Sequence, residues 1–406
     1  MAVSFVRRTK RQGAGPAPRE AAPLPVSDPA LPTTTGWLTR GRDGRLTAYA
    51  PAADGVLRWT ETRPGGPHWS GPVLLPAPGL LPYLSVAQGE DGYVHLAGMR
   101  RSRDAEGRPV SDVVYAVQFQ TGRPLRDWRA LSTPYPDDQE LAAQVGVPAA
   151  VVDREGALHL FVRNAGGGVC ARSQTKTGAW HQWVDLKGNG ITGGIRAAVA
   201  PDGRTEVLAP AAKRLLRWQR PESRVPFRRC EDLPFAAAAE APATEPTGDG
   251  RLTHFWHDGA DATVRAWRPA APAEPAAGDA GITVDAGTAG DPAEEAPEPA
   301  ALGTAPGAGP VAVLRAPVDG HDCTILAHRA RDTGRPALAA YPTEQESAGV
   351  EWTPTGSPCA GAPALALDGR NRVVMAVIGT DGALWVARQK AEAGLALGAW
   401  ERATTG

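Results

Sequence analysis

A short phrase recurs along most of the chain and strongly limits what it can fold into. An acidic residue followed by glycine leads into alternating apolar and polar residues, then a second alternating run, then a tryptophan. The clearest first turns are spaced 48, 64, 47 and 47 residues apart, with glycines at Gly44, Gly92, Gly156, Gly203 and Gly250. Such turns between period-2 runs are typical of β-hairpins, because glycine accepts the positive φ of a tight turn. We therefore expect antiparallel strands.

The phrase occurs seven times. The sixth copy, Val311–Leu314 and Cys323–His328, lacks the leading Asp-Gly, and the seventh begins at Asp368-Gly369 and ends at Trp400. A unit of about 47 residues holds about four short strands, the size of a propeller blade. One such blade buries both faces only between two neighbours. The sequence therefore predicts an all-β fold, a seven-bladed β-propeller of four-stranded antiparallel blades. A linear β-solenoid is the alternative, but its repeats are usually shorter.

The predicted propeller spans residues 35–406, and two segments lie outside its pattern. Residues 1–34 are rich in Ala and Pro with a basic head, and they predict a disordered arm. Residues 269–310 contain seven acidic residues and no Lys or Arg, which predicts a disordered acidic loop; a tail for a basic partner is the alternative. We expect Trp37–Thr39 and Trp400–Arg402 to be adjacent strands of one shared blade that closes the ring.

Composition argues against several classes of protein. The net charge is −1, so no global field attracts nucleic acid. No run of 18 apolar residues exists to span a membrane, and no apolar segment follows the basic head to form a signal peptide. The four cysteines form no C-x-x-C pair, which favours a reduced protein while leaving two disulfides open. We expect a cytoplasmic location, unless a non-classical route exports the chain.

Motifs for catalysis, metals and cofactors are absent. There is no G-x-S-x-G, H-E-x-x-H or Walker A sequence. Gly188–Gly193 matches G-x-G-x-x-G, but a strand-like run follows it where a dinucleotide site needs a helix. His254 and His257 are three apart on a predicted strand, so they point to opposite faces and should not share a metal. We therefore expect a protein without enzymatic activity, cofactor or metal.

Six tryptophans are candidate ligand-binding residues: Trp59, Trp180, Trp183, Trp218, Trp267 and Trp385. An indole offers a flat apolar face and one N–H donor, which suits stacking on a sugar ring. The alternative is that these rings fill the space between blades.

A polar set at the third position after each turn glycine shares one strand face and could line a channel or pocket, although a solvated face is the favoured interpretation. Its members are Thr47, His95, His159, Glu206, Thr253 and Arg372.

Three stretches carry a family resemblance: Trp180-His-Gln-Trp183 with the residues to Gly188, Ala197–Leu208, and Asp381-Gly-Ala-Leu-Trp385. They resemble the repeat of the fucose-binding propeller lectins of insect-pathogenic bacteria, over about residues 36–405 outside the acidic insert. The resemblance implies sugar pockets between adjacent blades, with aromatic rings under the sugar.

The predicted function is therefore lectin-like carbohydrate binding at inter-blade pockets. The alternatives are an intracellular protein-interaction scaffold and a carboxylate-dependent, glycoside-active enzyme. A binding arrangement repeated at several junctions would favour the lectin, and one kept at only one or two junctions would favour the scaffold.

Overall fold

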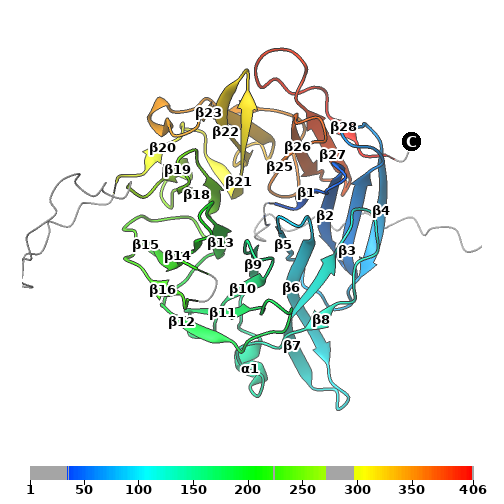
Figure 1. Cartoon of the computed structure of the whole chain (residues 1–406), viewed down its shortest axis with the longest axis vertical. Coiled ribbons are helices and arrows are strands. Elements are labelled where there is room, and N and C mark those ends of the chain that lie inside the picture. Colours follow the sequence, from blue (N-terminus) through cyan, green and yellow to red (C-terminus); the bar gives the residue numbers. More distant parts are fainter. Residues whose placement is uncertain (1–33, 35, 223–224, 271–296, 405–406) are drawn as a thin grey trace, which may run out of the picture.

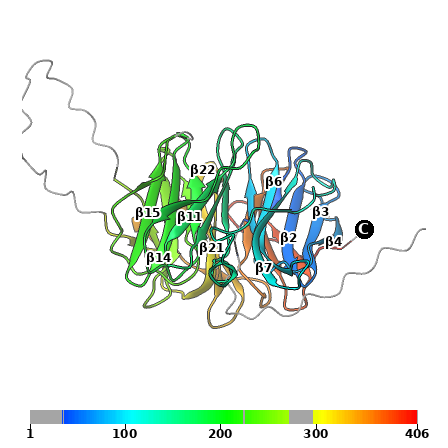
Figure 2. The ribbon, with the colours of Figure 1, turned by 90° about the horizontal axis from the view of Figure 1, so that it is seen from below.

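The strands of the chain form a ring of seven four-stranded sheets, as predicted (Figure 1). The computed structural model describes residues 34, 36–222, 225–270 and 297–404. In each blade the first strand lies nearest the centre of the ring and the fourth lies at its rim. Seen from the side, the blades stand next to one another in a squat ring (Figure 2).

The blades follow the chain in order, without exchange of strands. Blade 1 consists of β1 (Leu38–Arg40), β2 (Leu46–Ala52), β3 (Gly55–Glu61) and β4 (Trp69–Pro76), and blade 2 of β5 (Ser85–Gln88), β6 (Val94–Arg103), β7 (Pro109–Gln118) and β8 (Arg129–Ala130). Blade 3 consists of β9 (Ala149–Val152), β10 (Leu158–Arg163), β11 (Val169–Ser173) and β12 (Val184–Lys187), and blade 4 of β13 (Arg196–Val199), β14 (Thr205–Ala211), β15 (Arg214–Arg220) and β16 (Arg228–Arg229). Between blades 2 and 3 lies the short helix α1 (Gln139–Ala142).

The other three blades complete the ring. Blade 5 consists of β17 (Ala243–Pro246), β18 (Leu252–His257), β19 (Val264–Trp267) and β20 (Ala300–Ala301). Blade 6 consists of β21 (Gly307–Val318), β22 (His321–Ala330), β23 (Pro336–Pro342) and β24 (Thr353–Pro354). Blade 7 consists of β25 (Ala364–Leu367), β26 (Val373–Ile378), β27 (Leu384–Arg388) and β28 (Glu401–Arg402). A single 3-10 turn, η1 (Glu346–Ala348), precedes β24.

The first hairpin turn differs from expectation in two blades. Blade 6 has its own Asp-Gly turn, because Asp319 and Gly320 join β21 to β22 with φ of 51° and 81°. The sequence pattern missed this turn because the strands around it are longer than those of the other copies. In blade 7 the left-handed residue is Asn371, with φ of 58°, and not Gly369. As a result Arg372 is the residue that precedes β26, and it does not share the strand position of the predicted polar set.

The core of the molecule lies between the blades. Alternation along each strand sends successive side chains to the two neighbouring blades. In blade 4, for example, Val207 and Trp218 pack with Phe161 of blade 3, whereas Leu208 and Leu215 pack with residues of blade 5. Each sheet therefore depends on both of its neighbours to bury its two apolar faces.

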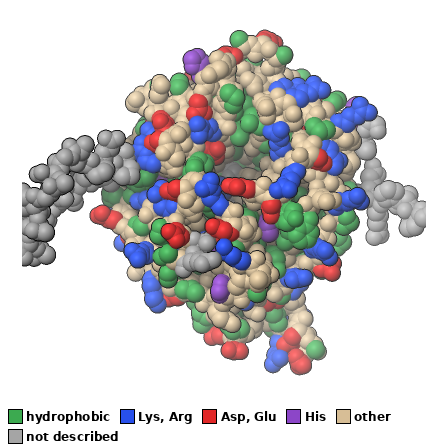
Figure 3. Space-filling model, in the orientation of Figure 1, with side chains coloured by type: hydrophobic (Ala, Val, Ile, Leu, Met, Phe, Trp, Pro, Cys, Tyr) green, Lys and Arg blue, Asp and Glu red, His purple; other side chains and the backbone are tan. Residues whose placement is uncertain are grey.

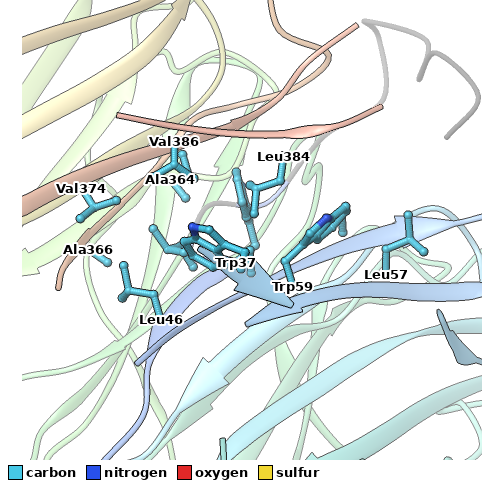
Figure 4. Packing of buried hydrophobic residues seen from close by; sticks show 14 residues of the cluster. Trp37, Leu46, Leu57, Trp59, Ala364, Ala366, Val374, Leu384 and Val386 are labelled. Atoms are coloured by element: carbon cyan, nitrogen blue, oxygen red, sulfur yellow. The ribbon is translucent and has the colours of Figure 1, made fainter. Parts of the chain in front are cut away.

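The expected shared blade is wrong: Trp37–Thr39 and Trp400–Arg402 are not adjacent strands. β1 pairs with β2 at the inner edge of blade 1, and β28 pairs with β27 at the outer edge of blade 7. The chain supplies four strands to every blade, so no strand has to be exchanged. The ring closes instead by packing Leu46, Trp59 and neighbouring residues against Ala364, Val374 and Leu384 (Figure 4).

A buried ion pair reinforces this closure. Arg388 on β27 donates to the Glu61 carboxylate of β3 (2.9 Å) and to the carbonyl oxygen of Gly66 (2.8 Å). The other Glu61 oxygen accepts from the backbone N–H of Leu46 (2.9 Å) and of Gly65 (3.2 Å). Since the Glu61 side chain is fully buried, it holds Arg388 and both ends of its own hairpin in one network.

The predicted insert is shorter than expected. Residues 300–310, which the sequence placed in a disordered loop, form β20 and the start of β21. Residues 1–33 and 271–296, to which the other predictions of disorder apply, lie outside the described residues. No helix among the described residues is long and apolar enough to cross a membrane.

We predict that Arg388→Met lowers the free energy of unfolding by about 3 kcal/mol, because it leaves the Glu61 carboxylate buried without its cation. Adding Glu61→Gln should recover part of this loss, since the uncompensated charge is then gone. Urea denaturation midpoints measure both effects. Lys187→Met, which breaks an exposed pair with Asp185, is the control and should leave the urea midpoint nearly unchanged, because solvent screens an exposed pair. An unchanged midpoint for Arg388→Met would show that the pair does not hold the ring closed.

Candidate ligand site between blades 2 and 3

Three of the six candidate tryptophans are structural. Trp59, Trp218 and Trp267 are 2%, 0% and 4% exposed. They occupy one equivalent position on the third strand of blades 1, 4 and 5, opposite Ala48, Val207 and His254. The ring of each packs against the preceding blade, and the Trp218 N–H donates to the Leu186 carbonyl oxygen (2.8 Å). With so little of each ring exposed, the contacts that the structure shows for these three residues are packing contacts.

Trp385 does not belong to this set. It lies two positions earlier on the third strand of blade 7, is half-buried, and donates its N–H to the Asp381 carboxylate (3.3 Å). The equivalent of Trp59 in blade 7 is Ala387.

Blade 3 carries an arginine where these three blades carry a buried tryptophan. Arg172 lies opposite Leu160, the register position that Trp218 occupies opposite Val207. Its side chain therefore points toward blade 2. Arg172 Nε donates to the carbonyl oxygen of His181 (2.8 Å), and one terminal nitrogen donates to the carbonyl oxygen of Leu131 in blade 2. Burial lowers the pKa of Arg172. Two backbone carbonyls thus fix the guanidinium at the junction of the two blades.

Two tryptophans flank this guanidinium. The Arg172 Cζ lies 6.0 Å from the ring centroid of Trp180 and 5.9 Å from that of Trp183. Trp180 also meets Tyr115 of blade 2 edge to face, with centroids 5.1 Å apart. Both indoles are half-buried, and neither N–H has an acceptor among the described residues. The structure thus brings together two of the predicted residues and one arginine that the sequence reasoning missed.

Trp180 and Arg172 are additions specific to blade 3. Trp183 precedes the outer strand, as Trp128, Trp352 and Trp400 do in other blades, so it also has a packing role. Trp180 lies three residues earlier, in the loop between β11 and β12. The signal in the sequence was the complete W-x-x-W of this copy together with an arginine in place of the third-strand tryptophan.

An exposed aromatic pair lies at the end of the same junction. Tyr93 and Phe119 are 36% and 43% exposed and meet edge to face, with centroids 4.8 Å apart. By strand alternation they continue the column formed by His95 with Val117 and by Ala97 with Tyr115, the face of blade 2 that packs against blade 3. The Arg126 Cζ lies 5.6 Å from the Phe119 ring centroid. Among the described residues, Tyr93 and Phe119 are the aromatic members of the large hydrophobic side chains that are exposed.

The predicted polar set is buried, which contradicts its favoured interpretation as a solvated face. Thr47, His95, His159, Glu206 and Thr253 are all at most 5% exposed, because they lie in the interfaces between blades. His95 is the exceptional member: neither ring nitrogen has a partner among the described residues. Burial lowers the pKa of His95 to about 4, so the ring is neutral at pH 7.

His159 is held in a fully paired chain. Burial alone would raise the pKa of Asp153, but His159 and Arg220 lower it overall, so the carboxylate is ionised and accepts from Nε2–H of His159 (2.8 Å). This leaves Nδ1 of His159 to accept from the Ser173 hydroxyl (2.7 Å). Because His159 is 1% exposed, the chain joins blades 3 and 4 and offers no access to a substrate.

Glu206 is similarly neutralised between blades 4 and 5. Burial alone would raise the pKa of Glu206, but His254 and Arg217 lower it to about 2. Its carboxylate lies 3.2 Å from His254 Nε2 and accepts from Arg217 (3.4 Å) and from Gln219 (2.8 Å). These contacts are the ordinary satisfaction of a buried charge.

The two histidines of β18 point to opposite faces, as predicted. His254 meets Glu206 of blade 4, whereas Nε2 of His257 lies 3.3 Å from Nδ1 of His328 in blade 6. Within the described residues, no group of three or more His, Cys, Asp and Glu is arranged to hold a metal ion.

Comparisons with known proteins identify the fold. No family model matches the chain, and no curated protein matches it in sequence. Among solved structures, a putative 6-phosphogluconolactonase from Bacteroides uniformis is 14% identical over 89% of this chain and 98% of its own, with a TM-score of 0.54. A polysaccharide lyase of family PL25, an ulvan lyase, is 9% identical over 88% and 94%, with a TM-score of 0.51. Aleuria aurantia lectin, in complex with Fucalpha1-6GlcNAc, is 12% identical over 81% and 98%, with a TM-score of 0.41. For the first two structures, at these identities, the likeness shows the fold alone.

We predict that His95 makes stability dependent on pH. Its folded pKa of about 4 lies below the unfolded value of about 6.5, so the unfolded chain gains a proton first as the pH falls. The contribution of the neutral His95 ring to the free energy of unfolding is complete above pH ~6.5. It falls by about 1.4 kcal/mol per pH unit between that pH and about pH 4. Urea denaturation at pH 7 and pH 5 should show a smaller loss for His95→Leu than for the native chain. His68→Leu, at an exposed site, is the control; equal losses in all three proteins would contradict the prediction.

Proposed function

We propose that this protein binds carbohydrate, with the ligand at the junction of blades 2 and 3. The observation that carries the proposal is Arg172, which replaces a structural tryptophan and lies beside the half-exposed rings of Trp180 and Trp183. A sugar offers an apolar ring face and hydroxyl groups. The indole faces suit the first, and the guanidinium is a donor for the second. The exposed Tyr93–Phe119 pair extends the same surface.

The arrangement occurs at this one junction among the described residues. Arg217 lies 5.4 Å from the Trp267 ring and Arg229 lies 4.8 Å from the Trp218 ring, but those tryptophans are buried and both arginines have carboxylate partners. A single site gives no avidity from repetition. This observation favours the second candidate function, a scaffold that recognises one protein partner through the same aromatic surface.

We propose that the protein acts by binding rather than catalysis. Glu61, Asp153 and Glu206, three of the buried carboxylates, are each paired with an arginine and are at most 3% exposed. Glu245 on the inner strand β17 is the observation that favours an enzyme. Burial raises its pKa to about 7, and it accepts from the backbone N–H of Arg315 (3.3 Å). Glycoside hydrolysis generally requires two carboxyl groups, and Glu245 is one half-buried group.

The test is a glycan array on the purified chain, followed by calorimetric titration of the best ligand. We expect Trp180→Ala and Trp183→Ala to weaken binding at least about tenfold, the equivalent of about 1.4 kcal/mol, because each removes an aromatic face. Trp385→Ala is the matched control, since it lies in blade 7, and should leave affinity unchanged. Melting temperatures of all three variants establish that they are folded.

Two outcomes would contradict this function. Absence of binding to every glycan, with a folded protein at high monosaccharide concentration, would leave the scaffold as the better account. Loss of binding in Trp385→Ala but not in Trp180→Ala would place the ligand elsewhere on the ring.

A further inference from the structure

Arg172 has no carboxylate partner among the described residues, because its hydrogen bonds go to two backbone carbonyl oxygens. Arg217 is paired with Glu206 between blades 4 and 5, and Arg388 is paired with Glu61 between blades 7 and 1. Removing a cation from water is costly unless an anion compensates it. Each of those junctions supplies that anion from its own side chains. At the blade 2–blade 3 junction Glu90 is paired with Arg154, and Arg172 is left without such a partner.

Two further arginines belong to the side of blade 2 that is turned toward blade 3. Arg126 lies over the exposed Phe119 ring, and Arg129 is paired in register with Tyr115, so it lies on the face of blade 2 that is turned toward blade 3. No described carboxylate forms an ion pair with either arginine. Asp127 is the acidic residue of this segment, and the segment from Arg172 to Trp183 contains Lys176 and no acidic residue.

The whole chain carries a net charge of −1, and charges of both signs are interspersed on the face seen in Figure 3.

We infer that the ligand at the blade 2–blade 3 junction is an acidic carbohydrate, one that carries a carboxylate or a sulfate group. This inference rests on the proposed function. Nε and one terminal nitrogen of Arg172 are held by the carbonyl oxygens of His181 and Leu131, which fixes the plane of the guanidinium. Its second terminal nitrogen donates to no described residue. A planar guanidinium held in this way presents its remaining N–H donors in a fixed direction, as anion recognition requires.

The aromatic residues make the same anion more attractive than it would be in open water. Trp180 and Trp183 place apolar atoms beside the guanidinium, and Tyr115 packs against Trp180, so the effective dielectric constant is lower and a charge pair is screened less. The rings also provide the surface for the rest of the sugar, which a free carboxylate or sulfate ion lacks. A sugar with an acidic group uses both features of the site, whereas a neutral sugar leaves the cation unpaired.

The experiment compares matched ligands by calorimetric titration of the full chain at low and at physiological salt. Cellobiuronic acid against cellobiose tests the carboxylate, and galactose 6-sulfate against galactose tests the sulfate. Hexaglutamate tests whether any polyanion suffices. We expect one acidic sugar to bind at least about tenfold more tightly than its neutral counterpart, with affinity falling as salt rises.

Two substitutions at Arg172 test the residue itself. Arg172→Gln removes the charge, and Arg172→Trp installs the residue found at the equivalent position in blades 1, 4 and 5, so at least one should fold. Both should remove the preference for the acidic sugar over its neutral counterpart, whatever they do to the affinity for the neutral sugar, because the measured quantity is the ratio of the two affinities. Arg101→Gln, at an exposed position of β6, is the matched charge control and should retain the preference.

The outcomes separate this inference from the proposed function. If no sugar of either kind binds, the proposed function fails. If neutral and acidic sugars bind equally, and Arg172→Gln changes neither, carbohydrate binding stands and the acidic ligand is ruled out. If hexaglutamate binds as tightly as the acidic sugar, the site recognises negative charge on a peptide, and the inference is overturned in favour of an acidic protein partner.

Discussion

The structure depends on packing between sheets that cannot exist alone. A four-stranded blade has two apolar faces, and strand alternation divides its side chains between its two neighbours. Six interfaces would leave one face of blade 1 and one face of blade 7 exposed to water. The seventh interface, with Trp59 in contact with blade 7 and Glu61 paired with Arg388, removes that exposed surface. Closure of the ring is therefore a requirement of the hydrophobic effect.

The same interfaces determine where a ligand can bind. Several junctions are filled by tryptophan, leucine and alanine, and the charges around Glu206 and Asp153 are neutralised within their junctions. Blade 3 departs from this pattern by one residue. Arg172 takes the place of a buried tryptophan, and a second tryptophan in the following loop covers it partly. A junction that is not completed by the protein itself is a natural place for a ligand.

Much of the fold could be predicted from the sequence because its determinants are local. The Asp-Gly turns fix positive φ at Gly44, Gly92 and their equivalents, and the alternating runs fix which side chains share a face. The errors arose where a local signal was altered. Asn371 replaces glycine as the left-handed residue of blade 7, which shifted the register of Arg372, and the long strands around Asp319 and Gly320 hid the turn of blade 6. Tryptophan positions were found correctly, but their exposure was not, because Trp218 and Trp180 look alike until the neighbouring blade is in place.

The sequence by itself determined that this chain is a ring of repeated β-blades, since turn chemistry and period-2 alternation act over a few residues. Tertiary structure alone decided three things: that the ring closes by packing rather than by a shared blade, that the polar positions after each turn are buried, and that Arg172 lies between Trp180 and Trp183 without an anion. Each of these depends on atoms brought together from different blades. Burial and charge pairing are properties of the assembled interface, and no spacing within one blade encodes them.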